Sequence, residues 1–322
     1  MLNQTEQYLN FEASQIAPDS WYDRIYTGDA RAVMQTLPEK SINLSFWSPP
    51  YFVGKEYEAH MTFSDWQELV AGVIAGHARV LDDGAFMVIN INDILCFTDP
   101  GMPRYMADNI SNKKVAVTRD DILKVKETHP RATRYELARL MGCSEQTIQR
   151  RLEHNNVRGG KHAAGTKVFI VGGLLQQWAE AAGLFLYDRR IWHKDPCWAN
   201  SRWHSNSYRA VDEYEYLYIF WKPGIVEIDR NRLQPGEWAQ WGSRAVWQIR
   251  SVQRNARHEC EFPEMLAERV IRLFSDAGDV VLDPFVGSGT TTVTAKKLRR
   301  KYIGIDRLAK YTELAERRTN GI

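Results

Sequence analysis

Short runs of β-branched and aromatic residues alternate along the chain with longer segments in which apolar residues recur at helical spacing. The runs predict strands at residues 24–26, 42–47, 85–91, 184–192, 214–221, 280–283 and 302–305. Helical spacing predicts helices at residues 64–80, 168–182, 263–275 and 290–298. Because strands and helices alternate and several strands are continuously apolar, we expect an α/β fold whose sheet is covered on both faces. Ligands of such folds bind at the carboxyl ends of the strands, so the loops that follow the strands are the candidate sites.

A glycine-rich turn follows the predicted strand at 280–283. It reads Pro284-Phe285-Val286-Gly287-Ser288-Gly289-Thr290-Thr291 and leads into a predicted helix. Glycines at 287 and 289 allow positive φ and close backbone approach, so the turn can surround a nucleoside or a cofactor tail, although such a turn can also be purely structural. The pattern is neither a P-loop nor a dinucleotide fingerprint. The next strand ends in Asp306, whose carboxylate can accept both hydroxyls of a ribose, and together the two features indicate a nucleoside cofactor.

A proline turn, Ser48-Pro49-Pro50-Tyr51, follows the predicted strand at 42–47. The two prolines fix φ and supply no N–H, which predicts a rigid turn with outward-pointing carbonyl acceptors between a hydroxyl and an aromatic ring. A turn capped by a buried tyrosine is the alternative that these four residues alone leave open.

The two turns together resemble the motif pair of the S-adenosylmethionine-dependent DNA amino-methyltransferases, which modify cytosine N4 or adenine N6. The order of the motifs, with the proline turn near the N-terminus, resembles the β group of that family. Further similarity lies in residues 258–266 with Phe262-Pro263, in Gly28-Asp29 and in the strand at 302–306. The resemblance covers most of the chain outside residues 97–166. It implies a doubly wound, Rossmann-like sheet and S-adenosylmethionine as the cofactor.

The resemblance also implies a mechanism. The Ser48 hydroxyl and the Pro49 carbonyl would accept the two hydrogens of the exocyclic amine, and Tyr51 would stack on a base flipped out of the duplex. Ser48, Pro49, Pro50 and Tyr51 are thus the implied catalytic residues, and no metal is required. Serine at the first position of the turn is more similar to the cytosine-N4 members, so cytosine N4 is favoured over adenine N6. The implied cofactor-binding residues are Gly28, Asp29 (for the adenine amino group), Phe262, Pro263, Asp283, Phe285, Gly287, Ser288, Gly289, Thr290, Thr291 and Asp306 (for the ribose).

A basic segment at residues 111–161 interrupts this pattern. It holds 12 Lys or Arg against 6 Asp or Glu, whereas the rest of the chain holds 30 against 34. Thr133 and Glu136 fit a capping box that begins a helix, and residues 137–152 read like a helix-turn-helix with Gly142 in the turn and Ala138 and Ile148 on the buried face. A helical hairpin used for packing or dimerisation is the alternative, and the positive charge favours DNA binding. Candidate DNA contacts are Gln146, Thr147, Gln149, Arg150 and Arg151 of the second helix, and Arg244 in residues 223–257, the usual recognition position of the β group.

We therefore expect a methyltransferase core at residues 1–110, 162–222 and 258–322, a small all-α helix-turn-helix insert at 111–161 and a target-recognition segment at 223–257. Seven of the 11 tryptophans lie between residues 192 and 247. Some of these should belong to the core, and others could stack on bases.

The composition of the 322 residues, 44% hydrophobic and 25% charged, excludes a disordered, collagen-like or coiled-coil chain. No apolar run approaches the roughly 18 residues of a membrane helix, and the start of the chain lacks a signal-peptide pattern. We therefore expect a cytoplasmic protein with no membrane partner. Cys96, Cys143, Cys197 and Cys260 lie too far apart for a zinc knuckle, so free thiols and no zinc are expected.

The leading hypothesis is a sequence-specific methyltransferase of double-stranded DNA, with a cognate restriction endonuclease and a homodimer as further expectations from the resemblance. A DNA-binding regulator with an inactive methyltransferase body is a second hypothesis, which the intact proline turn and Asp306 disfavour. A third is an RNA or protein methyltransferase, for which the helix-turn-helix would be superfluous.

Overall fold

The computed structural model describes residues 20–52, 61–99, 101, 116–152, 166–196, 210–226, 229–252 and 261–322. The chain divides into two compact units. The larger unit comprises Met1–Ile94, Val168–Cys197 and Asp212–Ile322, and the smaller comprises Leu95–Lys167 and Trp198–Val211.

An eight-stranded sheet forms the centre of the larger unit, in the order β1-β10-β9-β2-β3-β7-β6-β8. Strands β1, β10, β9, β2 and β3 run parallel to one another, whereas β7 runs antiparallel to both β3 and β6. The bounds are β1 (Arg24–Thr27), β2 (Ile42–Trp47), β3 (Leu81–Ile91), β6 (Phe185–His193), β7 (Tyr214–Trp221), β8 (Val246–Gln248), β9 (Val280–Asp283) and β10 (Lys301–Asp306). All four residues of β9 are buried, as expected of a central parallel strand covered on both faces.

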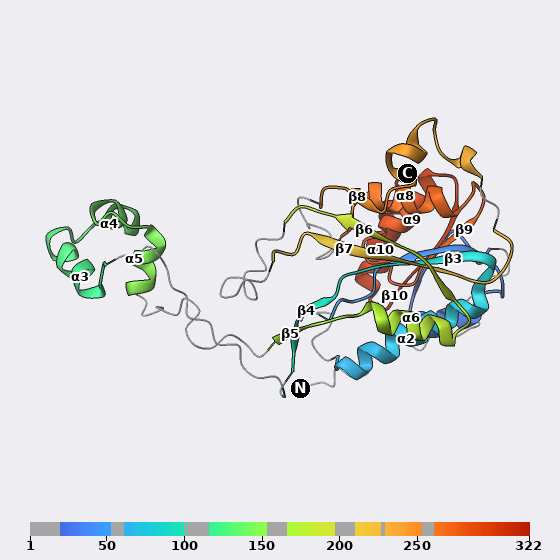
Figure 1. Ribbon diagram of the computed structural model, residues 1–322, viewed down its shortest axis with the longest axis horizontal. Coiled ribbons are helices and arrows are strands. Elements are labelled where there is room, and N and C mark those ends of the chain that lie inside the picture. The colour runs from blue at the N-terminus through green and yellow to red at the C-terminus, as the bar shows by residue number, and fades with distance from the viewer. Residues whose placement is uncertain are drawn as a thin grey trace. The chain divides into compact units, whose positions relative to one another are not determined.

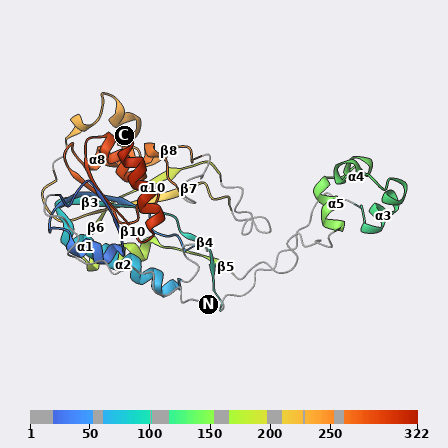
Figure 2. The ribbon, with the colours of Figure 1, turned by 180° about the vertical axis from the view of Figure 1, so that it is seen from behind.

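Helices cover both faces of this sheet (Figure 1). On one face lie α1 (Ala30–Thr36), α2 (Phe63–Val80) and α6 (Gly172–Ala181), and on the other lie α8 (Glu264–Phe274), α9 (Thr290–Lys297) and α10 (Ala309–Asn320). Figure 2 shows α10 and α1 from behind. The predicted α/β fold with both sheet faces covered is therefore confirmed. In the described part of the chain, no helix is both long and apolar enough to cross a bilayer.

One helix prediction is wrong at its beginning. Residues 168–182 were predicted to form a single helix, but Thr166–Phe169 is strand β5, paired with β4 (Ile94–Thr98), and α6 begins only at Gly172. The segment Thr166-Lys167-Val168-Phe169 contains three residue types that favour strands, Thr, Val and Phe, and this local preference outweighs the helical spacing. The spacing also misses α10, because the residues it buries are the small Thr312, Ala315 and Thr319.

Three helices of the smaller unit share a core of their own. They are α3 (Arg119–Thr128), α4 (Arg134–Leu140) and α5 (Glu145–Leu152), and the core is formed by Ile122, Leu137, Ala138 and Ile148. The predicted capping box of Thr133 and Glu136 is present at the start of α4. Gly142, in the turn before α5, has a φ of 61°, a conformation that favours glycine. The pair of helices expected in this segment is therefore observed.

Candidate active site

The two turns predicted from the sequence leave adjacent parallel strands at the same edge of the sheet. In the pairing of β2 with β9, Ser45 lies opposite Leu282, so the strand ends Trp47 and Asp283 lie at the same edge. The rings of Trp47 and Phe285 are 5.4 Å apart between centroids. Thr291 Oγ1 donates a hydrogen bond of 3.4 Å to the carbonyl of Phe46. The proline turn and the glycine turn therefore lie side by side.

The proline turn is anchored by hydrogen bonds at both ends. Ser48 Oγ donates to the Tyr51 hydroxyl at 3.1 Å, and that hydroxyl donates to Glu215 Oε2 at 2.6 Å. The indole of Trp66, a fully buried residue of α2, donates to the Pro50 carbonyl at 2.7 Å. Because the Pro50 carbonyl faces this buried indole, the expectation that both proline carbonyls point outward is wrong for Pro50.

The glycine turn owes its shape to positive φ angles at two positions. Gly287 has a φ of 47° and Gly289, the residue that caps α9, has a φ of 84°. A Cβ atom on Gly289 would lie 2.9 Å from Cα of Ala315 in α10, so a larger residue does not fit. The Gly287 amide donates to Asp306 Oδ2 at 3.2 Å, which joins the turn to the end of β10.

Two carboxyl groups flank this turn, the buried Asp283 and the half-buried Asp306. Burial raises the pKa of Asp283 to about 7, and burial also raises the pKa of Asp306. Asp283 Oδ1 accepts a hydrogen bond of 3.0 Å from the Phe285 amide. Buried carboxylates with raised pKa values are stabilised by a cation or by hydrogen-bond donors. S-adenosylmethionine has an ammonium, a sulfonium and two ribose hydroxyls, so its chemistry fits this pair of acids.

Gly28 and Asp29 follow β1 at the same edge. The Gly28 amide donates to the Asp306 carbonyl at 2.9 Å. Asp29 caps α1 by accepting from the Arg31 amide at 2.8 Å, and its Oδ2 pairs with the Arg31 guanidinium at 2.6 Å. Hydrogen bonding from Arg31 holds the pKa of Asp29 below its ordinary value, so the carboxylate is ionised. Its contact with an adenine amino group stays a prediction.

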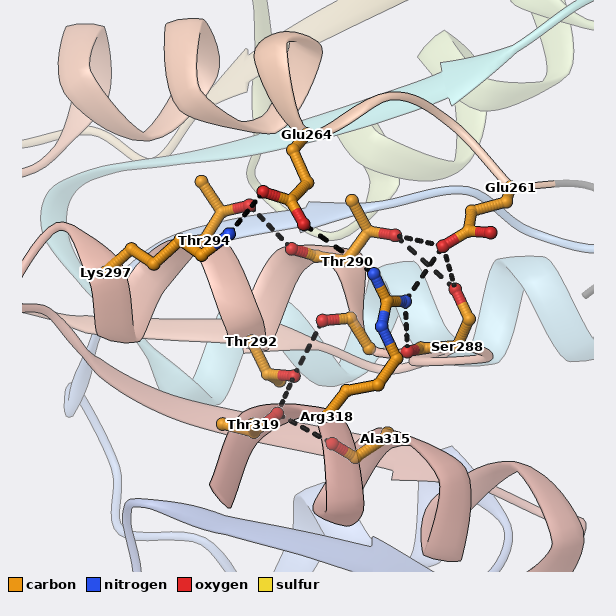
Figure 3. A network of polar contacts seen from close by, with 11 residues as sticks. Glu261, Glu264, Ser288, Thr290, Thr292, Thr294, Lys297, Ala315, Arg318 and Thr319 are labelled. Atoms are coloured by element: carbon orange, nitrogen blue, oxygen red, sulfur yellow. Dashed lines mark hydrogen bonds and ion pairs between the residues drawn. The ribbon is translucent and has the colours of Figure 1, made fainter. Parts of the chain in front are cut away.

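A polar network that the sequence did not reveal supports the glycine turn from behind (Figure 3). Glu261 Oε1 accepts from Ser288 Oγ at 3.0 Å, from Thr290 Oγ1 at 3.4 Å and from Arg318 Nη1 at 2.8 Å. Arg318, in α10, also donates to the Ser288 carbonyl at 2.6 Å. Ser288 and Thr290 are 4% and 3% exposed, so their hydroxyls bind the protein in this structure. Beside Glu261, the ring of Phe262 packs on Phe46 at 5.1 Å, and Pro263 caps α8.

A second polar cluster, also missed from the sequence, lies beyond the proline turn. It contains Glu215 at the start of β7, Lys194 just after β6, Asp212 and Asn92. The signal that could have revealed it is the single carboxylate within Tyr214–Trp221, a strand that is otherwise aromatic and apolar. A charge in such a strand needs a partner.

The predicted DNA contacts of α5 are only partly oriented outward. Thr147 Oγ1 lies 2.9 Å from Ser144 Oγ at the beginning of the helix, and Arg151 Nε donates to the Val117 carbonyl at 3.0 Å within the smaller unit. Gln149 and Arg150 are half-buried, and the side chain of Gln146 lies outside the described part. Arg244, in the larger unit, is exposed. DNA binding by these residues stays a prediction.

Residues 223–257 contribute substantially to the core. Trp241 and Trp247 are 7% and 1% exposed, and β8 extends the sheet beside β6. Trp192 is also buried, so these three rings are core rather than base-stacking platforms. Trp238 is 40% exposed. Trp198, Trp203 and His258 lie outside the described residues.

Comparison with known proteins identifies relatives along almost the whole chain. Residues 42–317 match a family described as DNA methylase, of the N6/N4 type. The type II methyltransferase M.BglI of Bacillus subtilis is 53% identical over 292 residues, 91% of this chain and 84% of the relative. The type II methyltransferase M.XycI of Xanthomonas campestris pv. cyanopsidis is 25% identical over 310 residues, which cover 92% and 87% of the two chains.

Solved structures show the same fold at lower identity. TTHA0409 of Thermus thermophilus, in complex with S-adenosyl-L-methionine, has a TM-score of 0.58 and 24% identity, covering 93% of this chain and 95% of that one. The cytosine-N4-specific PvuII DNA methyltransferase has a TM-score of 0.59 and 17% identity, covering 91% and 85%. On the strength of the family match and the identity to M.BglI, the chain belongs to the N6/N4 family of DNA methylases, enzymes that methylate DNA with S-adenosylmethionine as the methyl donor.

Proposed function

We propose that this DNA methyltransferase transfers a methyl group to the exocyclic N4 atom of a cytosine that is flipped out of double-stranded DNA. The observation that carries the proposal is the position of the two turns. A turn with neutral hydrogen-bond acceptors follows β2. A turn with two glycines at positive φ, flanked by Asp283 and Asp306, follows the neighbouring β9. One edge of the sheet thus offers acceptors for an amine and anions for a cationic cofactor.

The glycine turn and its flanking acids would hold the cofactor. S-adenosylmethionine, when bound, supplies an electrophilic methyl group on a positively charged sulfur. Asp283 offers a buried carboxylate to its cationic groups, and Asp306 offers a carboxylate to the ribose hydroxyls. Gly287 and Gly289 allow the backbone to approach the cofactor closely.

The proline turn would act on the base. An exocyclic amine is a poor nucleophile because its lone pair is delocalised into the ring. Accepting its two hydrogens at Ser48 Oγ and the Pro49 carbonyl favours a pyramidal nitrogen with a localised lone pair. Pro50 contributes by rigidity, because its carbonyl is held by Trp66. The ring of Tyr51 would stack on the base, which must leave the duplex to reach this edge.

The choice of cytosine rests on Ser48. Its hydroxyl is a neutral acceptor, as in the cytosine-N4 members that the turn resembles. The PvuII enzyme, which shares the fold, is named as cytosine-N4-specific, and this agrees with the proposal. Adenine N6 is the alternative product and is separated from cytosine N4 by the experiment below.

Recognition of a specific sequence would be shared between α5 and the exposed part of residues 223–257, including Arg244. The relatives are named as type II methyltransferases. On the basis of those names, we propose that a restriction endonuclease of the same sequence specificity accompanies this chain. Homodimerisation, as in many β-group enzymes, belongs to the same proposal.

Analysis of modified nucleosides tests the proposed product. Unmethylated genomic DNA is incubated with the protein and isotopically labelled S-adenosylmethionine, digested to nucleosides and examined by mass spectrometry. The proposal predicts labelled 4-methylcytosine. Labelled 6-methyladenine would refute the choice of base, and absence of any labelled nucleoside would refute the activity.

A further inference from the structure

The cluster beside the proline turn is a nearly buried network of charges. Lys194 Nζ pairs with Glu215 Oε1 at 2.6 Å and with Asp212 Oδ2 at 3.3 Å. The three side chains are 13%, 10% and 12% exposed. Asn92 Nδ2 donates to the other oxygen of Asp212 at 3.1 Å. Because β7 is antiparallel to β3 and β6, its first residues and the end of β6 lie at the same edge as the proline turn.

The network reaches Ser48 through Tyr51. Glu215 uses its two oxygens separately: Oε1 binds Lys194, and Oε2 accepts the Tyr51 hydroxyl at 2.6 Å. That hydroxyl in turn accepts from Ser48 Oγ at 3.1 Å. Burial opposes the charge of Lys194, but Glu215 and Asp212 outweigh it, so the pKa of Lys194 lies above its ordinary value and the ammonium remains charged.

The chemistry of these groups determines the direction of each hydrogen bond. An ionised carboxylate can only accept, so the single proton of the Tyr51 hydroxyl is directed to Glu215. A second acceptor, the Asn90 carbonyl, lies farther from that hydroxyl at 3.3 Å, and charge-assisted bonds are the stronger ones. The Tyr51 oxygen can then only accept from Ser48. Consequently the proton of Ser48 points to Tyr51, and its lone pairs are left for another donor.

From this geometry we infer that Glu215, held by Lys194, is a positioning residue that makes Ser48 an acceptor toward the target amine. The inference rests on the proposed function. A serine hydroxyl with an undirected proton could donate to the amine nitrogen. Such a bond would occupy the lone pair that must attack the methyl group. Glu215 prevents this by orienting the Tyr51 hydroxyl, which in turn orients the proton of Ser48. Glu215 itself does not contact Ser48.

Substitution of Glu215 by glutamine tests the inference, because the amide keeps the size of the side chain but removes the charge that orients the Tyr51 proton. Steady-state methyl transfer to unmethylated genomic DNA is measured with the full chain. We expect Glu215→Gln to lower kcat about 10-fold and to leave KM for DNA and for S-adenosylmethionine within about 2-fold. The matched control is Glu213→Gln, an exposed glutamate on the same segment, which should leave kcat unchanged.

A second background separates positioning from a general structural role. In Ser48→Ala there is no hydroxyl proton to direct, so adding Glu215→Gln should change kcat by less than about 2-fold. Equal kcat for Glu215→Gln and Glu213→Gln would overturn the inference, as would a full 10-fold loss in the Ser48→Ala background.

If Glu215→Gln does not fold, Tyr51→Phe replaces it as the test variant. This substitution keeps the aromatic ring and the charge cluster but removes the hydroxyl that links Glu215 to Ser48. Its effect on kcat must appear with Ser48 present and vanish with Ser48→Ala; an equal effect in both backgrounds would overturn the inference. A wild-type chain without methyl transfer would refute the proposed function itself, whereas an active wild type with an unaffected Glu215→Gln would refute the positioning role alone.

Discussion

Ser48 is the residue on which the proposed chemistry depends most directly. Its hydroxyl lies in the proline turn and is oriented by Tyr51. Replacing it with alanine removes one of two acceptors for the amine, so we predict that Ser48→Ala lowers kcat about 10- to 100-fold while cofactor affinity is unchanged. Methyl-transfer kinetics and calorimetric cofactor binding measure the two quantities. Ser41→Ala, at an exposed hydroxyl just before the same strand, is the control. Full activity of Ser48→Ala would count against the mechanism.

Asp283 links pH to cofactor binding. Because its pKa is raised to about 7 by burial, the carboxylate is protonated at pH 6 and ionised at pH 8. We therefore predict that wild-type protein binds the cationic cofactor more tightly at pH 8 than at pH 6, and that Asp283→Asn binds weakly at both. Titration calorimetry at the two pH values provides the measurement. An equal pH dependence in the variant would show that another group is responsible.

The same acid has a predictable cost for stability. In the unfolded chain it ionises near 3.8, whereas in the native state it keeps its proton until about pH 7, so native stability falls as pH rises through this window. Asp283→Asn removes that cost and should raise the free energy of unfolding at pH 8 by up to about 4 kcal/mol, with a much smaller gain at pH 4. Denaturant unfolding at both pH values measures the difference. A gain that is independent of pH would contradict the assignment to this carboxyl.

Residues differ in how far the sequence could identify them. Ser48, Asp283 and Gly289 belong to contiguous motifs at strand ends, so their chemistry could be predicted from residue type. The roles of Glu215 and Arg318 could not be predicted from residue type, because each side chain binds a residue that is distant in the sequence. Glu215 binds Tyr51, and Arg318 binds Glu261. Such pairs follow from topology, which spacing along one chain does not specify.

Among the elements, α10 does more than cover the sheet. Its Arg318 pairs with Glu261, whose side chain is 7% exposed, and binds the Ser288 carbonyl of the glycine turn. Arg318→Met would leave the Glu261 carboxylate buried without this partner. We predict a loss of about 3 kcal/mol in the free energy of unfolding, and partial recovery when Glu261→Gln is added. The exposed Arg317→Met is the control, and equal stability of the two single variants would contradict the prediction.

We propose that the helices α3, α4 and α5 contribute to DNA binding. Arg150 is the clearest candidate for a phosphate contact, because Arg151 donates to the Val117 carbonyl within the unit. Arg150→Ala should weaken DNA binding and reduce the slope of log affinity against log salt by about 1. Binding is measured by fluorescence anisotropy at several salt concentrations. Lys124→Ala on α3 matches the lost charge, and the same change in slope for both variants would contradict a specific role for α5.

Elements were predicted well where the apolar pattern is strong, and poorly where the buried side chains are small or a short strand directly precedes a helix. Strand Tyr214–Trp221 was predicted at its observed bounds because every central residue is apolar or aromatic. The helix α10 was missed because Thr312, Ala315 and Thr319 make a weak apolar stripe. At Thr166–Phe169 the β-forming residues Thr166, Val168 and Phe169 adopt a strand, although the helical spacing of the following residues begins at Val168.

In the whole molecule, the order of the strands in the sheet places the proline turn beside the glycine turn. The proline and glycine turns are separated by more than 230 residues, yet β2 and β9 are neighbours, as the hydrogen bond of Ser45 to the Leu282 carbonyl shows. The sequence predicted that both turns follow strands and that strand ends share an edge. It did not predict which strands are adjacent, because adjacency depends on how distant apolar runs pack.

A structure of the protein bound to S-adenosylmethionine and to duplex DNA with a flipped base measures the central relation directly. We predict that the sulfonium methyl lies between the glycine turn at Asp283 and the proline turn, with the target amine donating to Ser48 Oγ and to the Pro49 carbonyl. A cofactor bound away from Asp283 and Asp306, or an amine that contacts neither Ser48 nor Pro49, would contradict it.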